Sequence, residues 1–132
     1  MNLSNQVMAE EKVFVDFIKS YPSNTPVVML NILKFKERTD DGAKTGKESY
    51  YEYSRAVAPL LEKVGGKMLW AGKVNKTIIG DSSDHPQRIL LVQYPSKEAF
   101  VEMTTSEEYS KISHLREMAL EYGGLIATET IG

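Results

Sequence analysis

The segment Val27–Phe35, with the sequence VVMLNILKF, predicts a β-strand. It consists almost entirely of apolar and β-branched residues, and both of its alternating faces are apolar. Such a pattern is typical of a central strand that is covered on both sides. Pro26 precedes the segment, and a polar loop with two glycines follows it at residues 37–47. We therefore expect Val27–Phe35 to lie inside a sheet.

The chain on either side of this strand alternates between helical and extended patterns. Upstream, apolar spacings of three and four predict a helix over residues 5–20, capped by Ser4 and ended by Tyr21-Pro22. Downstream, the patterns predict a helix over 48–64 with a kink at Pro59, a strand over 67–80 bent near Gly72, a strand over 88–94, a helix over 97–103, a helix from the Thr105–Glu108 capping box to about Tyr122 that Gly123-Gly124 ends, and a last strand over 125–130.

This order is a helix followed by β-α-β-β-α-β, the split β-α-β arrangement of ferredoxin-like α+β domains. We expect one domain over residues 1–132, with residues 1–26 as a helical extension and 27–130 as the core. The helices cover one face of an antiparallel sheet, and the other face still carries apolar side chains. A second copy of the same sheet is the simplest cover, which predicts a homodimer of the dimeric α+β barrel kind.

Composition excludes several classes of function. Sixteen basic and 18 acidic residues give a net charge of −2 without a basic stripe, so we expect no nucleic-acid partner. The absence of cysteine excludes thiolate chemistry and is compatible with the cytoplasm. We expect no secretory signal and no membrane span, because the apolar runs are short. The sequence lacks the motifs of nucleophile-elbow, dinucleotide-binding and P-loop enzymes.

Five residues are candidates for a site. Asn31 is an amide inside an apolar strand and needs a hydrogen-bond partner, which is either a ligand or a structural neighbour. Trp70 and Tyr53 belong to an aromatic set that lines either a ligand pocket or the ordinary core. Arg116 points toward the core face of its helix and suits a buried carboxylate or an anionic ligand. His114 is the candidate proton carrier, or otherwise a surface or dimer-contact residue.

We expect neither a metal nor another cofactor. His85 lies beside Asp81 and Asp84 in a turn, which is too weak a set of ligands for zinc. The two histidines of the chain do not lie on strongly apolar faces, which argues against a haem ligand.

Several short stretches, taken in order, resemble a known family. They include LNILKF at residues 30–35, LWAG at 69–72, YPSKEAF at 94–100, HLR at 114–116 and LIAT at 125–128. Over about residues 27–130 the chain resembles the bacterial DUF1330 family of the dimeric α+β barrel superfamily, although Gly123-Gly124 departs from its pattern. The resemblance implies a ferredoxin-like fold and a dimer. It implies no particular activity, because the superfamily includes cofactor-free monooxygenases, isomerases, haem enzymes and binding proteins.

Two hypotheses follow for function. The first is a domain that binds a small organic ligand, between the sheet and the helices or at the dimer interface. The second is a non-catalytic structural or interaction module. A cofactor-free monooxygenase or isomerase is an enzymatic form of the first hypothesis.

Overall fold

The computed structural model describes residues 7–81 and 83–132. Its centre is a four-stranded sheet of β1 (Val27–Phe35), β2 (Lys67–Lys73), β3 (Arg88–Tyr94) and β4 (Leu120–Thr128). The strand order is β2-β3-β1-β4, and each neighbouring pair is antiparallel. Val27–Phe35 is therefore an inner strand with partners on both sides, as predicted.

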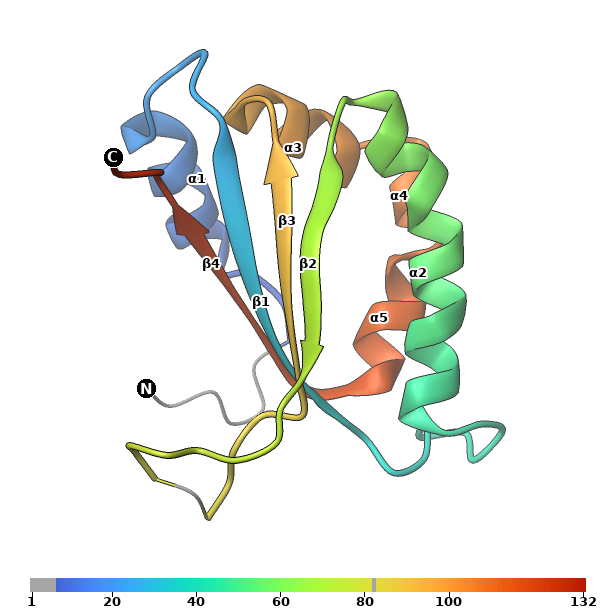
Figure 1. Ribbon diagram of the computed structural model, residues 1–132. Coiled ribbons are helices and arrows are strands. Elements are labelled where there is room, and N and C mark those ends of the chain that lie inside the picture. The colour runs from blue at the N-terminus through green and yellow to red at the C-terminus, as the bar shows by residue number, and fades with distance from the viewer. Residues whose placement is uncertain (1–6, 82) are drawn as a thin grey trace.

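Five helices are present in the described part of the chain: α1 (Glu11–Ser20), α2 (Gly46–Lys63), α3 (Lys97–Thr104), α4 (Glu107–Ser110) and α5 (Ser113–Ala119). They cover one face of the sheet, with α1 beside β4 and α2 at the far side of the helical layer (Figure 1). This arrangement confirms the predicted ferredoxin-like α+β fold and its additional N-terminal helix.

The two faces of the sheet differ in burial. On β1, the alternate residues that face the helices are buried, whereas those between them, including Leu30, are only half-buried. Leu30 lies opposite Leu91 of β3 and Ile126 of β4, and Trp70 of β2 lies opposite Leu91. Trp70 is 53% exposed. We call this apolar surface, on which no described helix packs, the open face.

The helix α1 is held to the core by ring packing and by a buried cation. The rings of Phe14 and Phe17 lie 6.2 and 6.1 Å from that of Phe100 on α3. The buried Lys97 donates hydrogen bonds from Nζ to the carbonyl oxygens of Ile18 (2.6 Å) and Tyr21 at the end of α1. A lysine at this position also interacts favourably with the negative end of the helix dipole.

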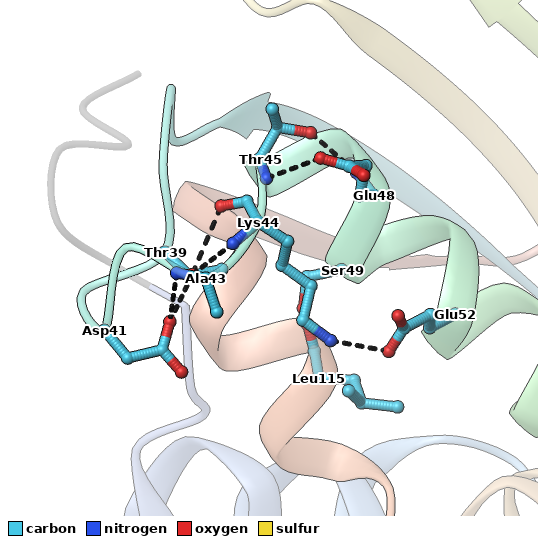
Figure 2. A network of polar contacts seen from close by, with 9 residues as sticks. All are labelled: Thr39, Asp41, Ala43, Lys44, Thr45, Glu48, Ser49, Glu52 and Leu115. Carbon is cyan, nitrogen blue, oxygen red and sulfur yellow. Dashed lines mark hydrogen bonds and ion pairs between the residues drawn. The ribbon is translucent and has the colours of Figure 1, made fainter.

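The N-terminus of α2 is fixed by a polar network (Figure 2). Thr45 and Glu48 form a reciprocal capping box, at 3.1 Å from Glu48 N to Thr45 Oγ1 and 2.9 Å from Thr45 N to Glu48 Oε1. One turn later, the buried Ser49 donates a hydrogen bond of 2.7 Å to the carbonyl oxygen of Leu115 on α5. These contacts set the position of α2 relative to α5, and thereby the position of the tyrosines that α2 carries.

The three largest differences from the predicted elements are in α1, in β2 and at the C-terminal end. Residues 7–10 are not helical, so α1 begins at Glu11 rather than at residue 5; the predicted cap Ser4 lies outside the described residues. The strand β2 ends at Lys73 and does not continue to residue 80.

The third difference is at the C-terminal end. The helix predicted from Thr105 to about Tyr122 is divided into α4 and α5 and ends at Ala119. The last strand begins at Leu120 rather than at residue 125, so Gly123-Gly124 lies inside β4 rather than at a helix end. Residues 120–128 pair with β1 along most of its length, so tertiary pairing outweighs the local signals. Thr105 is the C-cap of α3, and Ser106 rather than Thr105 caps the next helix.

Candidate functional site

A group of buried and half-buried polar and aromatic side chains lies between the sheet and the helices α2, α4 and α5. We call it the interior polar cluster; it consists of Asn31 on β1, Tyr50 and Tyr53 on α2, Tyr94 on β3, Tyr109 on α4 and Arg116 on α5. Five separate elements contribute to it, so its geometry depends on the whole fold.

Tyr53 contacts both Tyr50 and Tyr109. The rings of Tyr50 and Tyr53 are 5.4 Å apart, and the hydroxyls of Tyr53 and Tyr109 are hydrogen-bonded at 2.9 Å. Burial raises the pKa of Tyr50 to about 12 and raises the pKa values of Tyr53 and Tyr94 as well. At neutral pH these hydroxyls can donate hydrogen bonds.

Part of the hydrogen-bonding capacity of the cluster is unused. Within the described residues, the Asn31 amide and the hydroxyls of Tyr50 and Tyr94 have no hydrogen-bond partner. Among the buried side-chain polar atoms of the same residues, only the hydroxyl of Tyr122 has neither a partner nor solvent access. The polar atoms of Asn31, Tyr50 and Tyr94 therefore keep some solvent access although their residues are buried. These donors and acceptors are therefore accessible to water or to a small molecule.

Arg116 supplies a positive charge that no carboxylate of the described residues balances. Its Nη1 donates to the carbonyl oxygen of Val7 at 2.7 Å and its Nη2 to that of Gly123 at 3.1 Å. The missing side chain of Gly123 makes room for the guanidinium, since a Cβ there would lie 2.9 Å from Nη2. Arg116 is close enough to Tyr50 and Tyr53 to oppose the rise in their pKa values.

The register of the sheet places Asn31 and Arg116 on the same side of it. Gly123, which accepts a hydrogen bond from Arg116, pairs with Leu33, two residues along β1 from Asn31. Residues two apart on a strand point to the same face, so the amide of Asn31 lies on the side of the sheet where the guanidinium packs.

The structure thus brings three of the five predicted site residues to one side of the sheet: Asn31, Tyr53 and Arg116. Trp70 lies on the open face, and His114 is exposed on α5. The sequence analysis did not identify Arg88 as a neighbour of this cluster. Its guanidinium lies 4.8 Å from the ring centre of Phe35, and its charge opposes the rise in the pKa of Tyr50. Its position at the start of β3, in register with Leu33, was the available signal.

No group of three histidine or acidic side chains with the geometry of a metal site occurs among residues 7–81 and 83–132. His85 instead contacts the carbonyl oxygen of its neighbour Pro86 through Nδ1 at 3.0 Å. Over the same residues, no helix has the length and apolar character that a membrane span requires.

The four-stranded antiparallel sheet and its helical layer define a ferredoxin-like α+β protein. Comparison then gives the family: the sequence model of a domain of unknown function, DUF1330, matches residues 43–130, and the chain belongs to this family. A comparison with curated proteins finds no match.

Solved structures agree with this assignment. The RPA0582 protein of unknown function from Rhodopseudomonas palustris is 30% identical, with a TM-score of 0.91 over 98% of this chain and 99% of that chain. More distant similarities show the fold alone. A hydroxynitrile lyase from Passiflora edulis is 11% identical, with a TM-score of 0.60 over 82% and 95% of the two chains. A dimeric protein of unknown function with a ferredoxin-like fold from Bacteroides fragilis is 10% identical, with a TM-score of 0.52 over 80% and 96%.

Proposed function

We propose that this protein binds a small organic ligand in the interior polar cluster, between the sheet and the helices. The observation that carries the proposal is a set of three largely buried residues, Asn31, Tyr50 and Tyr94, whose polar atoms keep solvent access and have no hydrogen-bond partner among the described residues. Such atoms can exchange bound water for the polar groups of a ligand. Ligand sites are typically apolar surfaces with a few convergent polar groups, which describes this cluster.

Two adjacent tyrosines of α2 provide a matched test of this proposal. Tyr50 is 3% exposed and belongs to the cluster, whereas Tyr51 is 63% exposed on the outer surface. Protein purified without denaturation is analysed by native mass spectrometry for a co-purifying small molecule, in the wild type and in the variants Tyr50→Phe and Tyr51→Phe. We expect the wild type and Tyr51→Phe to retain the ligand and Tyr50→Phe to lose it. Equal retention in both variants would place the ligand elsewhere.

We also propose that two copies of the chain associate through their open faces. The supporting observation is the apolar surface around Leu30, Leu91 and Ile126, with the half-exposed Trp70 beside it. Large exposed apolar surfaces usually mark interfaces, and a face that pairs with its own copy gives a closed dimer. The dimeric ferredoxin-like protein from Bacteroides fragilis is a structural precedent.

Light scattering tests the dimer. We expect the wild type to be dimeric at micromolar concentration and Trp70→Asp to be monomeric, because the substitution places a charge in the interface. Tyr51→Asp, on the outer surface of α2, is the control and should leave the dimer intact. A monomeric wild type would contradict the proposal.

The second candidate function is a non-catalytic interaction module whose open face serves only association. The open face itself favours it, since an apolar face needs no ligand to explain it. In that case the native protein carries no small molecule although it is dimeric, so the two experiments together separate the candidates.

A cofactor-free monooxygenase or isomerase activity, with His114 as proton carrier, is the enzymatic form of the proposal. It requires the exposed His114 to reach a ligand from the outside of α5. We propose a cytoplasmic location, supported by the absence of cysteine. Fractionation of cells tests this location.

A further inference from the structure

We propose that the ligand of the interior polar cluster is a small organic acid and that its carboxylate binds the guanidinium of Arg116. The inference rests on the proposed ligand-binding function and adds the chemical class of the ligand.

The charge balance of the interior is the first argument. Arg116 is only partly exposed, and its hydrogen bonds go to the neutral carbonyl oxygens of Val7 and Gly123. Lys34, Lys36 and Lys44 each contact a carboxylate. The buried Lys97 also has carbonyl partners, but they lie at the negative end of the α1 dipole. Among the described residues, half-buried Arg116 has neither a carboxylate nor a helix end as a partner, and such a charge is ordinarily paired.

The donors around Arg116 are the second argument. A guanidinium has five N–H groups in a fork that fits a carboxylate, and the two contacts to carbonyl oxygens leave the other donors available. The neutral hydroxyl of Tyr50 is a further donor without a partner. A carboxylate has only acceptors, so it complements this set, whereas an ammonium or another cation would oppose it.

The surrounding side chains limit the rest of the ligand. Aromatic rings pack beside these donors: the ring centres of Phe35 and Tyr50 lie 5.5 Å apart, and those of Tyr50 and Tyr53 lie 5.4 Å apart. Aromatic faces favour a compact, flat or short aliphatic group. The Asn31 amide can orient a second polar atom of the ligand, because it both donates and accepts.

The test compares two probes of nearly equal shape and different charge. Benzoate and its neutral counterpart benzamide are titrated into the full-length chain, and binding is followed by nitrogen–proton correlation NMR at the backbone amides of Asn31, Tyr50 and Gly123. We expect benzoate to shift these amides saturably and benzamide to bind about tenfold or more weakly, as the loss of a charge-assisted pair implies.

Two arginine variants identify the group that binds the probe. Arg116→Gln should weaken benzoate binding by about tenfold or more. Arg55→Gln is the control: Arg55 is exposed on α2, where it lies 5.9 Å from the ring centre of Tyr51, and we expect unchanged binding. If Arg116→Gln does not fold, the comparison of benzoate with benzamide on the wild type still decides.

Three outcomes would overturn the inference. Equal binding of both probes at the cluster would reject the organic acid but leave the proposed ligand-binding function in place. Benzoate binding that survives in a folded Arg116→Gln would assign the charge to another group. The absence of benzoate binding would also reject the inference, while a neutral small molecule on native protein would still support the proposed function.

Discussion

Replacing Asn31 by leucine is expected to make the protein more stable and to abolish ligand binding. The Asn31 amide is buried and has no hydrogen-bond partner in the described part of the chain. Leucine has the same branching and number of side-chain heavy atoms, and the neighbouring side chains on the same face, including Leu33 and Leu90, are apolar. The substitution removes an unpaired amide and adds apolar contacts.

The size of the effect can be estimated from the burial of this side chain. An unpaired amide in a protein interior costs about 1–3 kcal/mol, and the residual solvent access of Asn31 favours the lower end of that range. We therefore expect the free energy of unfolding to rise by about 1–2 kcal/mol. For a chain of this length, that corresponds to a rise in Tm of roughly 3–10 °C.

Urea unfolding followed by circular dichroism, at one fixed protein concentration, measures the change. Ser49→Ala is the control with the opposite sign, because Ser49 is buried and its hydroxyl donates to Leu115 O. This variant should lose about 1–3 kcal/mol by leaving the carbonyl oxygen unpaired. If Asn31→Leu is destabilising by 1 kcal/mol or more, the amide is not vacant, and the main support for the ligand site is lost.

Three further predictions concern the framework around the site. Gly46→Ala should reduce the stability to urea by about 3 kcal/mol or more, because the new Cβ would lie 2.5 Å from Ala119 O; an unchanged midpoint would contradict this close packing. Because burial raises the pKa of Tyr50 in the folded state, ionisation of its hydroxyl should leave the stability unchanged below pH 10 and lower it as the pH rises toward about 12. Between pH 9 and 12, the Tm should therefore fall less steeply in Tyr50→Phe than in the wild type. Lys97→Met should destabilise the protein by about 1.5–3 kcal/mol and increase hydrogen exchange in α1, because its ammonium donates to Ile18 O; protection of α1 equal to that of the wild type would show that this contact is dispensable.

The fold could be predicted from the sequence wherever local and tertiary signals agree. Val27–Phe35 is a strand with exactly the predicted bounds, because its β-branched pattern also suits its central position. The helix predicted over 48–64 is α2, which starts two residues earlier because Thr45 and Glu48 form a capping box.

The C-terminal part shows why the rest could not be predicted. Gly123-Gly124 has the local signature of a helix end, but its function in the fold depends on a side chain that approaches from α5. A side chain at Gly123 would meet Leu120 Cδ1 at 2.6 Å and the guanidinium of Arg116 at 2.9 Å, so packing within the fold explains the glycine there.

The candidate site was predictable in part. Asn31 and Arg116 stand out as polar residues directed toward an apolar core, and the structure places both on the helical side of the sheet. The partners of these side chains, however, come from residues far away in the sequence. Arg116, for example, donates a hydrogen bond to the carbonyl oxygen of Val7, 109 positions earlier. No local pattern encodes such contacts.

Lys97 and Arg116 both bind the N-terminal region, and these contacts indicate where the folding unit begins. The family model matches the chain from residue 43, yet Lys97 and Arg116 donate hydrogen bonds to carbonyl oxygens within residues 7–21. A chain trimmed to the matched segment would also lack β1, the strand that joins β3 to β4. The matched segment is therefore part of a larger cooperative structure, and we expect it not to fold when expressed by itself.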